Sequence, residues 1–247
     1  MIDYLNIPTI ALINTPISKK LFADKAPLFA AEKRMLREDV ESIAMKGLLQ
    51  TRTIGLSSYS DDEYLYDQII VSEVRIKSLS KASAIATMIQ RAFPVPMFLI
   101  LSHDNQYSIN WCVKRINQAD RSKRVMEEQQ ITRFFAIDDR DIIAKSWLHS
   151  LDITKLQCPT LKDMFDELCG RLIMLTVSDE AGVFIEANAY RVEQFRAVLK
   201  ELADNREEQK KVSAEIKAET QFNAQLKLSS KLKTLQFEEK RIKEKLK

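Results

Sequence analysis

The sequence predicts an α+β fold: a mostly antiparallel sheet with flanking helices, followed by a long C-terminal helical tail. Three observations lead to this prediction. Segments rich in β-branched and alternating apolar residues lie between residues 65 and 137, and segments with helical spacing lie before and after them. From about residue 187 onward the chain contains neither glycine nor proline, which is typical of long helix. We therefore expect a globular α+β domain over residues 1–185 and a helical tail over residues 186–247.

The first predicted helix covers residues 30–49. Leu36, Val40 and Ile43 follow helical spacing there, and Gly47 lies where such a helix would stop. The next segment, TRTIGL at residues 51–56, predicts a short strand, and the acidic residues 57–64 predict a turn.

The central strands are predicted from residue 65 onward. In the strand at residues 65–78, Val74 and Ile76 share one face, while Glu73, Arg75 and Lys77 share the other. A helix over residues 79–93 follows. Its predicted cap is Ser80, and two prolines after it, Pro94 and Pro96, end it.

A β-hairpin is predicted for residues 97–116, with a polar turn at residues 103–106 and an alternating return strand. Residues 118–130 predict a mobile charged loop, and residues 131–137 another strand. A turn and a short helix follow at residues 138–151. The last helix of the domain covers residues 158–173, with Thr160 as its cap.

The tail carries a weak apolar seam with alternating spacings of four and three residues. Several positions of the seam are polar, so a strong self-sufficient coiled coil is not expected. A helical hairpin, or a helix docked on a partner, fits this pattern better. The seam residues are Val198, Leu202, Asn205, Gln209, Val212, Ile216, Glu219, Asn223 and Leu226, then Leu228, Leu232, Leu235, Glu239, Ile242 and Leu246.

Charge is distributed unevenly along the chain, whose formal net charge is +3. The basic excess lies in the tail from residue 206 onward, and the rest of the chain is slightly acidic. Such a tail is either a solvated helix surface or an element attracted to nucleic acid or to an acidic partner.

Composition excludes several classes of protein. The three cysteines form no C-x-x-C pair and only two histidines could join them, so we expect no metal site and no cofactor. Four glycines are too few for phosphate-cradling loops. The first twenty residues have no basic start, and Pro8 and Pro16 interrupt their apolar run. We therefore expect a cytoplasmic protein without a membrane segment.

One constellation on the predicted strand at residues 65–78 suggests metal-dependent nuclease chemistry. Asp67 and Glu73 could hold a divalent ion, and Lys77 or Arg75 could steady an attacking water. The alternative is a solvated strand face. No established catalytic motif is present, so a non-enzymatic role is expected before an enzymatic one.

A basic cluster between residues 114 and 124 suggests nucleic-acid binding, because phosphate contacts from lysine and arginine can combine with stacking on the nearby Tyr107 and Trp111. The alternative is a solvated loop. The cluster consists of Lys114, Arg115, Arg121, Lys123 and Arg124.

Phe222 lies between two amides, Gln221 and Asn223, near the start of the segment QFNAQLKLSSKL. Amides beside an aromatic ring can satisfy polar groups at a packed boundary, so we expect the ring to be buried at a helix contact, within the chain or against another molecule. We expect association through the tail to involve four apolar residues: Phe222, Leu226, Leu232 and Leu235.

The segment KAETQFNAQLKLSSKLKTL resembles the helical ending of a bacterial family, domain-of-unknown-function family 4391. The segments ISKKLFADKAPL, EDVESIAMKGLL and IQRAFPVPMFLIL, with the later Lys114 and Arg115, agree with this family as well. The resemblance covers nearly the whole chain. It implies a gene neighbourhood of Swi/Snf-type helicases and DNA methyltransferases in restriction-like phage-defence clusters, and it implies no catalytic residues.

From these observations we expect a non-enzymatic accessory or assembly subunit of a DNA-directed bacterial system. Its partner would be a helicase or methyltransferase of the same operon, or a second copy of the chain. A metal-dependent nuclease of atypical element order and a nucleic-acid-binding adaptor are the alternatives.

Overall fold

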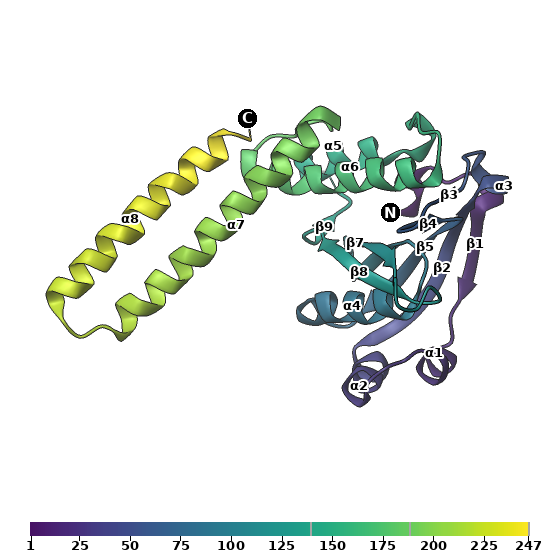
Figure 1. Cartoon of the computed structure of the whole chain (residues 1–247), viewed down its shortest axis with the longest axis horizontal. Helices are drawn as coiled ribbons and strands as arrows, with labels where there is room; N and C mark the ends of the chain where they lie inside the picture. Colours follow the sequence, from purple (N-terminus) through teal and green to yellow (C-terminus); the bar gives the residue numbers. More distant parts are fainter. Residues whose placement is uncertain (139, 188, 247) are drawn as a thin grey trace. The chain divides into compact units, whose positions relative to one another are not determined.

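The structure is a computed structural model that describes residues 1–138, 140–187 and 189–246 (Figure 1). The chain divides into two units, Met1–Leu172 and Ile173–Lys247. The division falls inside helix α6 (Leu161–Ala181). The border expected from the sequence lies between residues 185 and 186, after the end of this helix.

A seven-stranded mixed sheet forms the centre of the first unit, with strand order β1-β2-β5-β6-β7-β8 and β9 paired to β7. All neighbours are antiparallel except β5 and β6, which are parallel. Helix α4 (Ala82–Ala92) makes the crossover that a parallel pair requires. The predicted fold class is confirmed. The strands are β1 (Leu12–Pro16), β2 (Val40–Gln50), β5 (Gln68–Ile76), β6 (Met97–His103), β7 (Gln106–Ile116), β8 (Arg124–Ile131) and β9 (Phe135–Ala136), and a separate pair consists of β3 (Tyr59–Ser60) and β4 (Leu65–Tyr66).

Helices cover both faces of the sheet. On one face α4 packs with α1 (Lys19–Lys25) and α2 (Ala30–Glu38) around a core that includes Ile85, Ile89, Val74 and Leu99. On the other face Phe165 of α6 stacks on Phe98 and Tyr66. Trp147 of α5 (Ile142–Leu148) packs edge-on against Phe135. Short 3-10 turns complete the first unit at Ile2–Leu5, Thr9–Ala11, Leu79–Lys81, His149–Leu151 and Ile153–Lys155.

The helix predicted for residues 30–49 is wrong in its second half. Helix α2 ends at Glu38, and the chain continues as strand β2. The register of β2 against β5 shifts twice, between Val40 and Ser42 and between Met45 and Gly47. These bulges break the two-residue alternation that identifies a strand, so Leu36, Val40 and Ile43 mimic helical spacing.

Gly47 does not end a helix but lies in the second of these irregularities. A Cβ atom there would come within 3.1 Å of Ile7 Cδ1. Glycine therefore allows a close approach between β2 and the N-terminal segment.

Residues 51–54 form the short helix α3 (Thr51–Ile54), so the strand predicted here is also wrong. The backbone N–H of Gln50 donates to Thr53 Oγ1 at 2.9 Å, which starts the turn. Gly55 ends it with a φ of 76°, a left-handed conformation that glycine adopts without strain.

The charged segment after residue 117 is partly a strand. Strand β8 covers Arg124–Ile131, where a mobile loop was predicted, and the strand predicted at 131–137 shrinks to Phe135 and Ala136. Strand β8 is at an edge of the sheet and buries little, so backbone pairing with β7 forms it without an apolar pattern in the sequence.

Several local predictions agree with the structure. The hairpin of β6 and β7 turns where expected, and Asp104 has a φ of 49° in that turn. Thr160 and Asp163 cap α6 reciprocally. Ser80 does not cap α4: Lys81 is the capping position, and the Ser80 hydroxyl lies 2.9 Å from that of Ser78.

The predicted tail is a helical hairpin, made by α7 (Ala189–Ala218) and α8 (Phe222–Glu244) (Figure 1). The seam positions of α7 from Val198 to Ile216 are buried or half-buried, and so are those of α8 from Leu228 to Leu246. The alternating spacing of four and three therefore identifies the contact face correctly at these positions. It is wrong for Asn223 and Leu226, which end the first series and are exposed. Among the described residues, no helix combines the length and the apolar character needed to span a bilayer.

Candidate interaction surface

The residues predicted for metal-dependent chemistry do not come together. Asp67 lies in a bend before the start of β5, whereas Glu73 lies inside the strand, and a rise of about 3.3 Å per residue puts about 17 Å of strand between Gln68 and Glu73. Lys77 follows the strand and is exposed. In the part of the chain that the structure describes, no three His, Cys, Asp or Glu residues are grouped as metal ligands would be.

Glu73 instead joins three strands through side-chain contacts. Its Oε1 accepts a hydrogen bond from Ser102 Oγ of β6 at 3.2 Å, and its Oε2 lies 3.4 Å from Lys46 Nζ of β2. Lys46 also donates to Asn14 Oδ1 at 2.8 Å. Both carboxylate oxygens therefore have partners within the sheet.

Lys114 is the buried member of the predicted basic cluster, with 3% of its surface exposed. Its ammonium donates to the carbonyl oxygens of Phe93 and Val95, at 2.7 and 2.9 Å. These carbonyls follow the end of α4, where a lysine can satisfy backbone acceptors that the helix leaves unpaired. Burial lowers the pKa of Lys114 to about 8. This lysine therefore ties β7 to the segment after α4, and its buried ammonium is not accessible to a nucleic acid.

The other members of the basic cluster have partners of their own. Arg115 pairs with Glu127 at 2.8 Å, Arg121 lies 3.7 Å from Asp62, and Lys123 pairs with Asp120 at 2.9 Å. Arg124 donates to the carbonyls of Arg121 and Lys123. Three of these cations therefore face carboxylates, and with Lys114 buried the segment exposes fewer unpaired charges than the sequence suggested.

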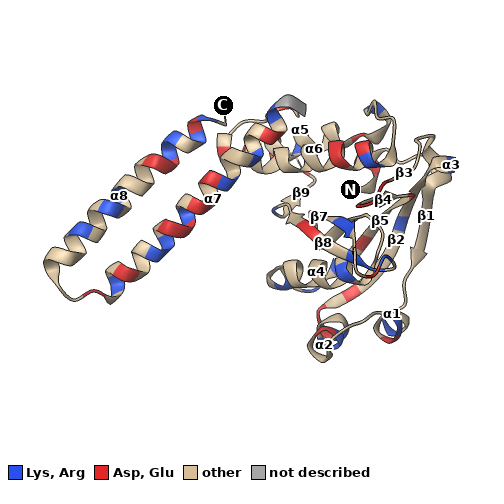
Figure 2. Cartoon of the chain, in the orientation of Figure 1, with Lys and Arg blue, Asp and Glu red and all other residues tan. Residues whose placement is uncertain are grey.

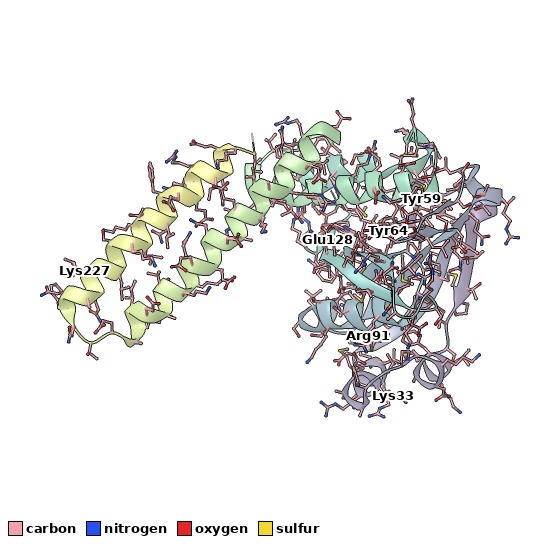
Figure 3. All side chains as sticks on the ribbon, in the orientation of Figure 1. Lys33, Tyr59, Tyr64, Arg91, Glu128 and Lys227 are labelled. Atoms are coloured by element: carbon pink, nitrogen blue, oxygen red, sulfur yellow. The ribbon has the colours of Figure 1, made fainter. Side chains whose placement is uncertain are left out.

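A cluster that the sequence did not reveal joins the β3–β4 hairpin to α6. Lys162 Nζ lies 5.7 Å from the ring centre of Tyr59 and 5.6 Å from that of Tyr64, both labelled in Figure 3. The Tyr64 hydroxyl donates to Glu127 at 2.9 Å, and this hydrogen bond raises the pKa of Tyr64 to about 12. Lys162 also pairs with Asp166 at 2.6 Å. The cluster stabilises the hairpin.

A cavity of about 300 Å³ lies where the first 3-10 turn meets the turns after α5. Tyr4 and His149 line it, with their rings edge-to-face at 5.6 Å. Its carboxylate Asp152 already accepts hydrogen bonds from Asn6 and Thr154. The remaining lining residues are Asp3 and Lys155, which lies 3.6 Å from Asp152.

A polar layer crosses the second unit at the hydrophilic seam positions. Arg206 of α7 makes two hydrogen bonds to Glu180 of α6, at 2.6 and 2.9 Å, and one to Glu239 of α8 at 2.9 Å. Gln209 donates to Glu239 at 2.8 Å. Lys243 lies 3.1 Å from Glu180. The seam residues Gln209 and Glu239 are therefore hydrogen-bonded between α7 and α8, and Arg206 extends the network to α6.

These contacts lower the pKa values of the Glu180 and Glu239 carboxyl groups. Hydrogen bonds from Arg206 and Lys243 lower the pKa of Glu180. Hydrogen bonds from Gln209 and Arg206 lower the pKa of Glu239. The same pairs raise the pKa of Arg206, so the network is fully charged near neutral pH.

The side of α8 that faces away from the seam carries exposed apolar residues. Phe222 is 73% exposed, Leu226 60% and Phe237 64%. At about 100° per residue, these three side chains fall within about 60° of arc, roughly opposite the seam. We call this surface, with Ser229, Ser230, Lys233 and Lys240 between and beside its apolar residues, the outer face of α8.

The structure divides the four residues expected to mediate association. Leu232 and Leu235 are half-buried in the seam against α7, whereas Phe222 and Leu226 lie on the outer face. Burial of Phe222 within the chain was therefore a wrong prediction. Its two amide neighbours make no cap: Glu219 Oε1 accepts from the N–H groups of Thr220 and Gln221 and so shapes the turn.

Basic residues lie along α8, as its blue segments in Figure 2 show. Lys231 and Lys245 pair with the α7 carboxylates Glu208 and Glu201. Lys233 and Lys240 make no ion pair with any residue that the structure describes. Their charges are available to another molecule.

Comparison with known families gives one match. The sequence model of a domain of unknown function (DUF4391) matches residues 5–238. The chain belongs to this family. The match extends from the first 3-10 turn through most of α8, so the family includes both the sheet and the hairpin. Neither the curated proteins nor the solved structures contain a match to the chain.

Proposed function

We propose that this member of the family is a non-enzymatic accessory or assembly subunit of a DNA-directed bacterial system of the phage-defence or restriction-like kind. In this proposal the helical hairpin is the element through which the protein associates. The observation that carries it is the outer face of α8, where Phe222, Leu226 and Phe237 are exposed on one side of a helix whose other side is already packed.

Exposed aromatic residues that cluster on one helix face favour association. Full burial of a phenylalanine or leucine side chain stabilises a complex by about 1.5–3 kcal/mol. Isolated apolar residues on a surface are normal, but a group of them on one rigid element is typical of an interaction site. The hairpin supplies such an element, because the Arg206 network fixes its helices against each other.

Two kinds of partner are compatible with this face: a protein of the same system, such as a helicase or methyltransferase, or a second copy of the chain. The DNA-directed context rests on the gene neighbourhood that the family resemblance implies. The nuclease alternative lacks support because Asp67 lies in a bend before β5 and Glu73 inside it, and among the described residues neither belongs to a group of three or more possible metal ligands. The adaptor alternative is weakened because Lys114 is buried.

The proposal can be tested by co-purification from cells that express the native operon. Tagged wild-type protein is compared with a variant that carries Phe222→Ala, Leu226→Ala and Phe237→Ala. A matched control carries Glu207→Ala, Lys211→Ala and Glu215→Ala on the exposed surface of α7. Mass spectrometry should find a protein of the operon with the wild type and the control but not with the triple variant.

Recovery of the same proteins with all three baits would show that the outer face is not the association element. Recovery of no operon protein with any bait would contradict the accessory role. DNA or RNA cleavage by the purified wild type with Mg²⁺ or Mn²⁺, abolished by Glu73→Ala, would replace the proposal by the nuclease alternative.

A further inference from the structure

We infer that the outer face of α8 is a self-association surface on which two copies of the chain pair antiparallel, with the twofold axis beside Ser229 and Ser230. This inference rests on the proposed function and specifies one occupant of the outer face, a second copy.

The positions of the exposed residues are symmetric along the helix. Phe222 and Phe237 are equally distant in sequence from the junction between Ser229 and Ser230. When two such helices run antiparallel about that junction, Phe222 of each copy lies opposite Phe237 of the other. The patch is thus complementary to itself, which is the requirement for a twofold interface.

The residues between the aromatic pairs fit the same arrangement. Ser229 lies opposite Ser230 of the second copy at the crossing point, and small side chains there allow the two helices to approach closely. The aromatic pairs at both ends can then meet edge-to-face or offset. Leu226 lies opposite Lys233 of the second copy, whose aliphatic stem can cover the leucine while its ammonium stays in water.

Charge selects the antiparallel orientation. In a parallel pair Lys233 would face Lys233 and Lys240 would face Lys240, which places like charges together. In the antiparallel pair the two Lys233 side chains are offset by seven residues, or about 10 Å of helix. Lys240 then lies at the end of the patch nearest the α7–α8 turn of the second copy, which carries the acidic Glu219.

The size of the patch predicts a weak dimer. From their exposed fractions, the three apolar side chains would bury roughly 350–400 Å² on each copy. The apolar contact of the pair is then roughly 700–800 Å². Since apolar atoms make up a little over half of a typical interface, this corresponds to the lower limit of the 1,200–2,000 Å² or so of total area in stable complexes. We therefore expect dissociation in the micromolar range and a monomer at high dilution.

The first test measures the mass of the full chain by sedimentation velocity across low to high micromolar concentrations. The wild type should shift from monomer to dimer, and Phe237→Ala should raise the dissociation constant about tenfold or more. Ile142→Ala is the matched control, because Ile142 is 74% exposed and apolar but lies on α5. It should dimerise like the wild type, and all three proteins should keep the same helical content.

The second test determines the orientation by cysteine cross-linking. Two single variants, Leu226→Cys and Lys233→Cys, are made in a Cys158→Ser background, because Cys158 is the native cysteine that is not buried. When the two proteins carry different tags and are mixed and oxidised, the mixed disulfide dimer should dominate. A parallel pair would instead give Leu226→Cys homodimers and Lys233→Cys homodimers.

Several results would overturn the inference. These are a monomer at every concentration, a dimer that Phe237→Ala leaves unchanged, and parallel cross-links. A wild-type monomer that binds phosphatidylserine vesicles or duplex DNA through Lys233 and Lys240 would assign the outer face to another ligand. A monomer that still co-purifies with an operon protein would contradict this inference but not the proposed function. A dimer that recovers no operon protein would support this inference and contradict the proposed function.

Discussion

The sheet of the first unit and the seam of the α7–α8 hairpin are built on different principles. In the sheet, β6 buries every residue from Met97 to Ser102, and helices cover both of its faces. In the seam, only a few positions such as Leu202, Val212 and Ile242 are buried, and Asn205, Gln209 and Glu239 lie between them. The sheet therefore depends on apolar burial, whereas the hairpin combines sparse burial with a hydrogen-bonded polar layer.

This difference indicates where each region obtains stability and where it obtains specificity. Apolar burial contributes free energy in proportion to area but accepts many arrangements of similar volume. A polar layer contributes less, yet its groups are satisfied in one register only, as with a buried asparagine in a coiled coil. We expect Arg206, Glu180 and Glu239 to fix the register of α7, α8 and the end of α6 in this way.

The largest expected effect is in the core of the sheet. Phe165 is fully buried, with its ring 4.7 Å from Phe98 and 5.4 Å from Tyr66. Phe165→Ala should lower the free energy of unfolding by about 3–5 kcal/mol, because it removes apolar contacts and leaves a cavity. Chemical denaturation measures this. Phe237→Ala, the same truncation at an exposed site, is the control. Equal losses of unfolding free energy in the two variants would contradict the conclusion that the sheet depends on apolar burial.

A smaller effect is expected in the polar layer. Arg206→Ala should destabilise the second unit by about 1–2 kcal/mol, since it leaves Glu239 and Glu180 with fewer donors. The side chain of Arg206 is 39% exposed, so water screens part of the loss. Hydrogen exchange of α7 and α8 amides locates the change. Lys211→Ala, which removes an exposed pair with Glu207, should leave exchange unchanged.

Lowering the pH should destabilise the hairpin through the same polar layer. Because the folded pKa values of Glu180 and Glu239 lie below the ordinary value of 4.5, these carboxylates contribute stability that is complete above about pH 4.5. The contribution is lost as pH falls through the lowered folded values. Arg206→Ala should weaken this acid dependence. An acid profile identical in both proteins would show that the network does not couple to hairpin stability.

The smallest effect is expected at Phe222. Since its side chain is 73% exposed, Phe222→Ala should change the free energy of unfolding of the dilute monomer by less than about 0.5 kcal/mol. Thermal or chemical melting at low concentration measures this value. A loss near that of Phe165→Ala would show that the ring is buried after all.

Secondary-structure elements with a clear local hydrophobic pattern were predicted correctly, and elements without one were missed. The hairpin of β6 and β7 combines an apolar run with a polar turn, and the Thr160 cap precedes an apolar helical pattern, so both were found. Strand β2 was missed because its two bulges hide the alternation, and β8 because an edge strand needs little apolar surface.

The candidate site was predicted only in part. The seam spacing placed Leu232 and Leu235 correctly on a packed face, but it also placed Leu226 there, and Leu226 lies with Phe222 on the opposite face. Likewise, the sequence analysis assigned Lys114 and Arg115 to one basic cluster, although neighbouring residues of a strand point to opposite faces. The tertiary structure buries Lys114 and pairs Arg115 with Glu127.

The sequence by itself determined the α+β class and the helical tail, because hydrophobic periodicity and the absence of glycine and proline act through local conformational preference. It left open whether the tail folds into a hairpin or docks on a partner. Only the tertiary structure decided which charges are free and which apolar residues are left exposed. Lys114 is buried against two backbone carbonyls, and Glu73 forms an ion pair with Lys46 on another strand. Arg206 forms ion pairs with Glu180 and Glu239 on other helices. The physical reason is that burial and ion pairing depend on residues distant in sequence, and no local pattern records which of them will meet.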